Sequence, residues 1–378
     1  MRGGGDDLAS GTGRGLTAGS ANNLRPVVEA REGVPLGPLT TLRVGGPAVR
    51  LVEPSGEEEL VGAITEVDAG GEPLLVLAGG SNVVIADEGF PGTVVRVGHG
   101  GHRQAGERDG RVIVEAAAGE DWDGFVAATV AEGLAGVEAL SGIPGTVGAT
   151  PIQNVGAYGQ EVASTIESVR VFDRRAGAER TLTPQECRFG YRTSALRHDD
   201  ALVVLAVTFA LAPGGKSPAA YEELGRALGV EAGGQAPSAE IRDAVLALRR
   251  AKGMVLDPAD HDTWSAGSFF TNPVMSDADF EALAERAAGL GLSEPPRFPA
   301  GEGMVKGSAA WCIEQAGFSR GEARGPVALS GKHALAITNR GGATAAEVLG
   351  FAHEIAGRVE EMLGVPLRPE PSLVGLEW

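Results

Sequence analysis

Glycine is concentrated in one segment of the chain, Ser141 to Gly159, which reads SGIPGTVGATPIQNVGAYG. Positions 142, 145, 148, 156 and 159 are all glycine, and the segment has few charges that could solvate it as a surface loop. Glycine allows positive φ angles and a close approach of backbone to another group. Two interpretations fit this pattern: the backbone packs against a bound ligand, or the segment is a buried crossover between two elements.

Length and charge limit the class of protein. The 378 residues exceed the roughly 250 to 300 at which one hydrophobic core stops growing, so we expect two or three domains. A formal net charge of −18 and a pI near 4.8 argue against a nucleic-acid partner, because this field repels phosphate backbones.

The two cysteines, Cys187 and Cys312, indicate a reducing compartment. The chain has neither an apolar signal segment nor a membrane-length apolar run, so we expect a cytoplasmic protein without membrane insertion.

Hydrophobic periodicity predicts strands alternating with helices. We expect strands at 74–77, 93–97 and 111–116 in a mixed sheet, a hairpin of 168–173 with 179–183, and further strands at 201–211 and 334–338. Helices are expected after the capping residues Asp121, Ser238 and Thr344, and two more are expected to start at Ser276 and at Ser308. The predicted division is a disordered tail at 1–24, units at 25–97 and 98–234, and a last domain at 235–378.

A second glycine turn follows the first predicted strand. Leu74 to Asn82 reads LLVLAGGSN, and the exposed backbone amides of this turn are suited to cradle a diphosphate. A tight turn without a ligand is the alternative. No glycine fingerprint of a Rossmann site follows a predicted strand, and the six histidines lack ligand spacing, so no metal is expected.

These segments, with Gly190 to Ser194 (GYRTS), Gly267 to Pro273 (GSFFTNP) and Pro369-Glu370, resemble the UDP-N-acetylenolpyruvoylglucosamine reductases from about Thr40 to the C-terminus. The resemblance implies an α+β fold, with a two-part FAD-binding region of the vanillyl-alcohol-oxidase (PCMH) type and a smaller α/β substrate-binding domain. It also implies FAD and NADPH as cofactors, a UDP-sugar substrate and a place in peptidoglycan synthesis. We expect a monomer.

The resemblance assigns the two glycine segments to FAD. The residues expected to bind it are Gly79, Gly80, Ser81, Asn82, Ser141, Gly142, Ile143, Pro144, Gly145, Gly148, Ala149, Gly156 and Ala157.

Three residues take catalytic roles by resemblance. Arg192 is expected to stabilise the charge that forms beside the substrate carboxylate, since its planar fork binds a carboxylate at two points. Ser268 resembles the proton donor to C2, and Glu370 resembles a second group on the carboxylate side, protonated or hydrogen-bonded. The structural alternatives are an ion-paired arginine, a turn serine and a solvated glutamate.

Substrate binding is expected at Tyr158, Tyr221, Lys252, Asn272 and Lys306. Tyr221 in AAYEEL resembles the mobile tyrosine of the longer subclass of this family, and Lys252 resembles a contact to the diphosphate. Only four of the 32 basic Lys and Arg residues are lysines, and three of these four lie beyond residue 234. An ordinary exposed lysine is the alternative for each.

The chain departs from the family pattern at Ala78, Thr271 and Pro371, which puts fine affinities in doubt. The residues argue against two other functions. A flavin oxidase of the same fold often attaches FAD through a histidine, and neither glycine segment contains one. A non-enzymatic flavin-binding paralogue would need the loss of Arg192, Ser268 or Glu370.

Overall fold

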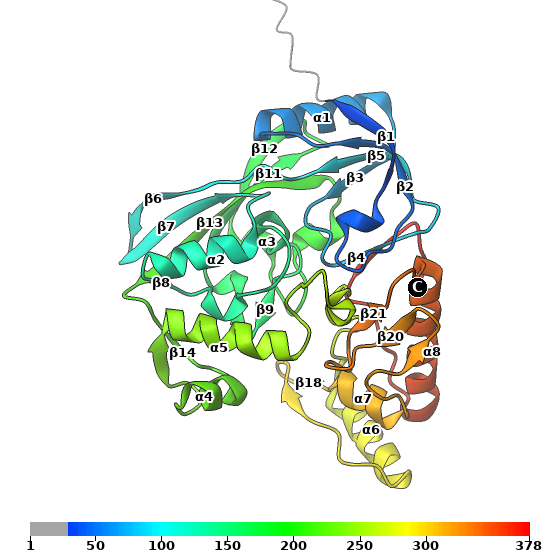
Figure 1. Ribbon diagram of the computed structural model, residues 1–378. Coiled ribbons are helices and arrows are strands. Elements are labelled where there is room, and N and C mark those ends of the chain that lie inside the picture. Colours follow the sequence, from blue (N-terminus) through cyan, green and yellow to red (C-terminus); the bar gives the residue numbers. More distant parts are fainter. Residues whose placement is uncertain (1–28) are drawn as a thin grey trace, which may run out of the picture.

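The computed structural model describes residues 29–378, and the tail predicted at 1–24 lies outside the described residues. Figure 1 shows two sheet-containing parts at one end of the molecule and a mostly helical C-terminal part at the other. Among the described residues no helix is both long and apolar enough to cross a membrane.

The first part is a four-stranded sheet in the order β1-β2-β5-β3. Its strands are β1 (Ala30–Pro35), β2 (Pro47–Val52), β5 (Phe90–Arg96) and β3 (Leu74–Leu77). Strands β2 and β3 both pair with β5 in parallel, so helical crossovers are expected.

Helix α1 (Glu57–Gly70) connects β2 to β3 and was not predicted from the sequence. It begins with three glutamates, which suit the positive end of a helix, and ends at Gly71 with φ 68°. Leu60, Ile64 and Val67 form its buried face, at helical spacing. The signal for this helix was therefore present in the sequence.

The second part is an antiparallel sheet in the order β12-β11-β13-β7-β6. The strands are β12 (Ala178–Leu182), β11 (Ile166–Asp173), β13 (Leu202–Pro213), β7 (Arg111–Ala117) and β6 (His102–Arg108), and β8 (Leu134–Ala135) pairs with the end of β13. The predicted hairpin is confirmed as β11 and β12, joined in antiparallel register. The prediction of one mixed sheet was wrong, because β7 pairs with β13 and not with β5.

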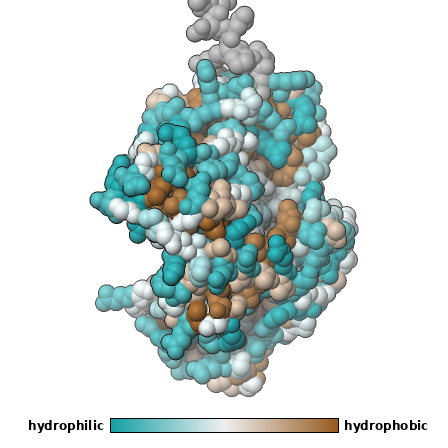
Figure 2. Space-filling view, turned by 60° about the vertical axis from the view of Figure 1, so that its left-hand side comes forward, coloured by the Kyte–Doolittle hydropathy of each residue, from teal (hydrophilic) through white to brown (hydrophobic). Residues whose placement is uncertain are grey.

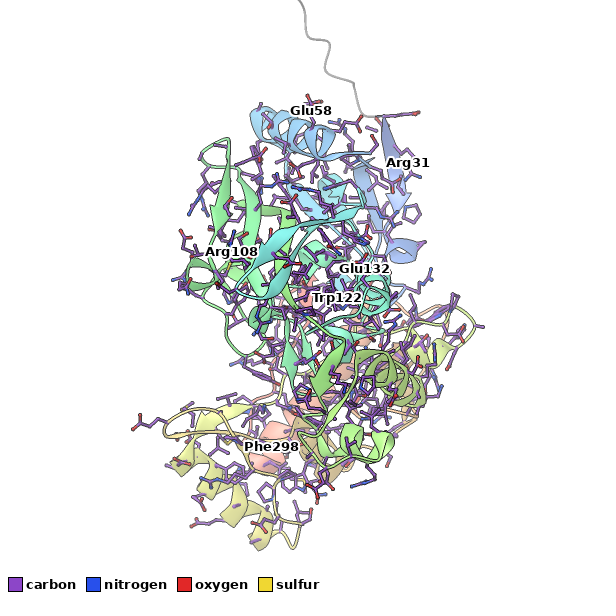
Figure 3. All side chains as sticks on the ribbon, turned by 90° about the vertical axis from the view of Figure 1, so that its left-hand side faces the viewer. Arg31, Glu58, Arg108, Trp122, Glu132 and Phe298 are labelled. Atoms are coloured by element: carbon purple, nitrogen blue, oxygen red, sulfur yellow. The ribbon has the colours of Figure 1, made fainter. Side chains whose placement is uncertain are left out.

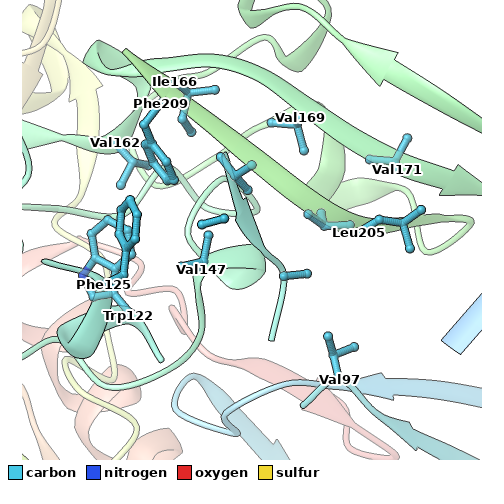
Figure 4. Close-up of a cluster of buried hydrophobic side chains, with 14 of the residues drawn as sticks. Val97, Trp122, Phe125, Val147, Val162, Ile166, Val169, Val171, Leu205 and Phe209 are labelled. Carbon is cyan, nitrogen blue, oxygen red and sulfur yellow. The ribbon is translucent and has the colours of Figure 1, made fainter. Parts of the chain in front are cut away.

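Helix α2 (Trp122–Ala131) covers this second sheet. The Asp121 carboxylate accepts a hydrogen bond from the Gly124 amide and caps the helix, as predicted. Figure 4 shows the core beneath it, where Phe125 lies between Trp122 and Phe209, with ring centroids 5.8 and 5.0 Å away. Trp122 lies inside the molecule in Figure 3, whereas Glu58 on α1 is at the surface.

Short elements connect the second sheet to the cleft described below. They are β9 (Gly156–Ala157), β10 (Gln160–Glu161), α3 (Pro184–Cys187), β14 (Lys216–Pro218), α4 (Glu222–Leu228) and β15 (Gln235–Pro237). Helix α5 (Ser238–Ala251) follows β15, and Ile241 and Val245 pack in one core cluster with Ala139 and Leu224. Ser238 was predicted to cap this helix, but the cap residue is Pro237 and Ser238 is buried in the first turn.

The C-terminal part packs α6 (Asp277–Gly289), α7 (Ala309–Gln315) and α8 (Ala345–Leu363) around two small sheets. The sheets are β16 (Val274–Ser276), β18 (Met304–Lys306) and β17 (Phe298–Pro299), and β19 (Ala323–Arg324), β20 (Val327–Leu329) and β21 (Ile337–Asn339). The predicted helix starts at Ser276 and Ser308 are confirmed, and both serines cap their helices. The predicted capping box of Thr344 and Glu347 is also confirmed.

The strand predicted at 334–338 is shifted. It begins only at Ile337, because the Ala336 amide donates a turn hydrogen bond to the His333 carbonyl. After α8 the chain returns to the first part, where β22 (Ser372–Val374) pairs in parallel with β4 (Val83–Ile85). This return brings Glu370 next to the 79–82 turn.

Candidate active site

A cleft of about 640 Å³ lies where the three parts meet. Both glycine segments line it, together with Arg192, Ser268 and Glu370. The space-filling view in Figure 2 shows the molecule indented between its upper and lower parts. Pockets of this size hold a drug-sized ligand.

The turn between β3 and β4 packs against the longer glycine segment. A Cβ on Gly79 would lie 2.7 Å from the Gly145 Cα, and a Cβ on Gly80, whose φ is +60°, would lie 2.2 Å from the Leu39 oxygen. Neither position tolerates a side chain. Within residues 29–378, the backbone amides of Gly79, Gly80 and Ser81 have no hydrogen-bond acceptor. The turn therefore combines close packing with free N–H donors at a cleft, which suits a diphosphate.

The longer glycine segment is both a buried crossover and a wall of the cleft. A Cβ on Gly148 would lie 2.5 Å from the Ala118 Cβ, and the Gly148 amide donates to the Ala118 oxygen at 2.8 Å. Residues 143–146, 148–150 and 155–156 line the cleft. The two interpretations of this segment are thus compatible. Three residues predicted to bind FAD, Ser141, Gly142 and Ala157, lie outside the lining, and Ser141 is fully buried.

Arg192 occupies a turn in which Gly190 and Thr193 pair with each other. Its φ of +54° is unusual for a residue with a side chain, and such conformations occur at functional sites. One Nη donates to the Gly156 oxygen at 2.6 Å, and Nε lies 3.3 Å from a carboxylate oxygen of Glu370. The guanidinium is therefore fixed between the glycine segment and the C-terminal return.

Glu370 is held by its backbone. Its N–H donates to the Phe269 oxygen, and its carbonyl accepts from Arg197 at 2.8 Å and from Asn82 at 3.3 Å. Burial raises the pKa of the Glu370 carboxyl, and Arg192 and Arg197 oppose that rise. A proton on this carboxyl is thus favoured relative to an exposed glutamate.

Ser268 comes directly before two fully buried rings, Phe269 and Phe270, which anchor the segment. The Phe269 amide donates to Leu335, and Phe270 pairs with Pro369. The Ser268 side chain lines the cleft, and its Oγ lies 3.4 Å from the Nε2 of His333. Ser268 and Glu370 are thus on neighbouring strand-like segments.

The five predicted substrate residues form two groups outside the lining of the cleft. In the first, the Lys252 Nζ lies 5.6 Å from the centre of the Tyr158 ring and donates to Glu223 at 2.6 Å. Tyr221 begins α4 and is 54% exposed. In the second, the Lys306 Nζ lies 4.8 Å from the centre of the Tyr191 ring. Asn272 uses its side-chain oxygen to accept from the Ala309 amide.

Sequence reasoning missed Arg249, which lines the cleft. Burial lowers the pKa of its guanidinium to about 10, and its Nε is buried without a partner in the described part of the chain. One Nη donates to the Met254 oxygen at 2.7 Å. The signal was its spacing, since Ile241, Val245 and Arg249 recur every four residues on the inner face of α5.

Ala78, where the sequence departs from the family pattern, is among the residues that line the cleft. Within residues 29–378 no group of three His, Cys, Asp or Glu side chains is arranged to hold a metal.

Comparisons with known proteins agree with this geometry. Residues 257–374 match the C-terminal domain of UDP-N-acetylenolpyruvoylglucosamine reductase, and residues 48–183 match an FAD-binding domain. The enzyme of that name from Thermobifida fusca is 53% identical over 346 residues, which are 91% of this chain and 97% of that protein. The one from Streptomyces coelicolor is 52% identical over 361 residues, which are 94% of this chain and 93% of that protein.

A solved structure of a UDP-N-acetylenolpyruvylglucosamine reductase from Thermus caldophilus is 28% identical, with a TM-score of 0.59, and the match covers 92% of this chain and 99% of that one. The α+β fold is thus a two-part FAD-binding region of the vanillyl-alcohol-oxidase type with a smaller α/β domain. The chain belongs to the UDP-N-acetylenolpyruvoylglucosamine reductase family.

Proposed function

We propose that this FAD-dependent reductase uses NADPH to convert UDP-N-acetylglucosamine enolpyruvate to UDP-N-acetylmuramate, for peptidoglycan synthesis in the cytoplasm, and acts as a monomer. The observation that carries the proposal is the convergence of Arg192, Ser268 and Glu370 on a cleft lined by two glycine segments. These residues are far apart in the sequence. Together they would bind the substrate carboxylate, donate a hydrogen bond to it and deliver a proton to C2.

The residues at the cleft fit FAD. The free amides of Gly79, Gly80 and Ser81 are suited to its diphosphate, and the unpartnered Nε of Arg249 is a donor for another acceptor group of the cofactor. Bound FAD would supply the hydride that reduces the enolpyruvyl double bond.

Arg192 would bind the carboxylate of the enolpyruvyl group. Because its guanidinium is fixed by Gly156, it can stabilise the negative charge that spreads over C2 and the carboxylate without first reorganising. Only interactions that strengthen in the transition state accelerate the reaction.

Glu370 would act beside Arg192 as a neutral acid. An ionised carboxylate would repel the substrate anion, whereas a protonated one can donate a hydrogen bond to it. The raised pKa of the Glu370 carboxyl supports the protonated form. Its distance of 3.3 Å from the Arg192 Nε would let both groups contact one carboxylate.

Ser268 would deliver the proton to C2. Its Oγ–H bond breaks as the C2–H bond forms, and this proton transfer neutralises the negative charge of the enolate. The buried rings of Phe269 and Phe270 hold the serine in place, so little conformational freedom has to be lost when the substrate binds.

The nucleotide part of the substrate would bind at the rims of the cleft. Lys252 at the end of α5, Tyr158 beside it and Tyr221 at the start of α4 would form one rim, and Asn272 and Lys306 of the C-terminal part would form the other. A UDP-sugar between the rims would place its diphosphate near a lysine.

The test is to purify the protein, record its absorption spectrum and follow NADPH oxidation at 340 nm with and without UDP-N-acetylglucosamine enolpyruvate. We expect a flavin spectrum and substrate-dependent oxidation, with a product two hydrogens heavier by mass spectrometry. Rapid NADPH oxidation that consumes oxygen and ignores the UDP-sugar would favour the flavin oxidase instead.

A further inference from the structure

His333 lies in a loop whose conformation is fixed by a buried serine. Ser330 is fully buried, and its Oγ accepts hydrogen bonds from the amides of Lys332 at 3.0 Å and His333 at 3.1 Å. The Ala336 amide closes the other side of the loop on the His333 carbonyl. These hydrogen bonds fix the backbone from which the His333 imidazole extends.

The same loop is attached to the segment that carries Ser268. The Phe269 amide donates to the Leu335 oxygen at 2.7 Å, and both residues are buried. This bond keeps the two segments side by side and brings the His333 Nε2 within 3.4 Å of the Ser268 Oγ. Two anchored backbone segments thus bring the side chains of Ser268 and His333 together.

A serine beside a histidine often marks a nucleophile with its base. The surroundings argue against that role here. Three cations act electrostatically on His333: Lys252, which follows the last residue of α5, Arg320, and Arg249 of α5. Burial and these cations lower the pKa of the His333 imidazole to about 4. Accepting the serine proton would create an imidazolium next to three cations.

A neutral imidazole carries one N–H, and its position determines what the serine can do. If Nε2 accepts from the serine, the hydroxyl proton is directed away from the substrate. If Nε2–H donates, the serine oxygen is the acceptor and its proton is free to point into the cleft. Only the second arrangement suits a serine that protonates carbon.

We propose that His333 is a positioning residue for Ser268, whose Oγ accepts the Nε2–H hydrogen bond and thereby directs its own proton to C2 of the enolpyruvyl group. This inference rests on the proposed function. As the Oγ–H bond breaks and the C2–H bond forms, the Nε2–H stabilises the negative charge left on the oxygen. The serine then regains a proton from water.

The inference is tested with His333→Ala and His333→Gln, since the glutamine amide keeps a donor. Stopped-flow absorbance of the flavin follows each half-reaction separately. Reduction by NADPH should stay within about twofold of the wild type, and oxidation by the UDP-sugar should be slowed roughly 10- to 100-fold in His333→Ala. His333→Gln should recover much of that loss. The matched control His353→Gln changes an exposed histidine on α8 and should leave both half-reactions unchanged.

Non-additivity separates positioning from general damage. If His333 acts only through Ser268, the double variant Ser268→Ala/His333→Ala should be no slower in oxidation than Ser268→Ala alone. Additive losses, equal slowing of both half-reactions, or no difference between the Ala and Gln variants would overturn the inference. Wild-type protein that does not reduce the UDP-sugar at all would instead refute the proposed function.

Discussion

The guanidinium of Arg192 lies 3.3 Å from the Glu370 carboxyl, although 178 residues separate them in the chain. The pair forms because β22 returns beside β4 and carries Glu370 into the cleft. Burial still raises the pKa of the Glu370 carboxyl, so desolvation outweighs the attraction of the arginine. The pair is therefore suited to share an incoming carboxylate.

Replacing Glu370 with glutamine tests the protonation state. As pH rises through the raised pKa, the wild-type carboxyl loses its proton. It then can no longer donate a hydrogen bond to the substrate carboxylate. Glu370→Gln remains neutral, so its rate of oxidation by the UDP-sugar should be less sensitive to rising pH. Identical pH profiles for the two proteins would show that the ionisation of Glu370 does not affect the rate, and a wild-type rate that rises with pH relative to the variant would show that the glutamate acts in its ionised form.

The FAD should be noncovalent. The described lining of the cleft contains no histidine or cysteine that could attach the cofactor. Both cysteines are buried, and burial raises the pKa of Cys187 to about 11 and that of Cys312 to about 12, so neither is a ready nucleophile. Acid precipitation should release all the yellow colour into the supernatant. Colour that stays in the pellet would contradict this.

Gly148→Ala should weaken FAD binding and lower stability. The new methyl would lie 2.5 Å from the Ala118 Cβ, and overpacking of this kind costs about 1 to 3 kcal/mol. Gly350→Ala is the control, because this glycine is exposed on α8 with nothing within 4 Å and alanine favours a helix. Flavin fluorescence titration and thermal melting measure both effects. Equal behaviour of the two variants would show that the glycine segment is not tightly packed.

His333 should make the protein sensitive to acid. Its pKa is about 4 in the folded protein and near 6.5 when unfolded, so between these values the unfolded chain binds more protons. Stability contributed by the neutral imidazole is therefore lost as pH falls from about 6.5 towards 4. Urea unfolding of His333→Gln at several pH values should show a smaller loss than in the wild type. Parallel losses would mean that the imidazole is not held neutral.

Local signals in the sequence predicted the starts of α2, α6 and α8, since Asp121, Ser276 and Thr344 act on amides within their own first turn. The same signals missed α1 and wrongly made Ser238 the cap of α5. Sheet membership could not be predicted in this way. Strand β7 pairs with β13, almost a hundred residues further on, and no periodicity within a strand specifies that partner.

Arg192, Ser268 and Glu370 were expected to be catalytic by resemblance to a family, and only the structure shows that they meet at one cleft. Arg249 was missed because only the apolar residues of its helix were considered, although its spacing from Ile241 and Val245 places it on their face. His333 was missed because it touches Ser268 only through the long-range pairing of Phe269 with Leu335.

Lys252 is predicted by resemblance to contact the diphosphate, and in the structure it pairs with Glu223 of α4 at 2.6 Å. Glu223 lies two residues after Tyr221, and the Tyr221 side chain is exposed. An incoming diphosphate would therefore have to replace this carboxylate. Both partners are more than a third exposed, so the pair is weak enough to be displaced.

Lys252 should bind the diphosphate more strongly than another exposed lysine, and the Glu223 carboxylate should compete with the diphosphate for it. Lys252→Ala should raise the KM for the UDP-sugar, whereas Lys216→Ala, an exposed lysine on β14, should not. Glu223→Gln should lower that KM or leave it unchanged, because Lys252 then has no carboxylate to exchange for a phosphate. Steady-state kinetics with saturating NADPH measure all three. Equal effects of the two lysine variants would show that only general charge matters, and a raised KM in Glu223→Gln would show that the ion pair holds Lys252 in its binding position.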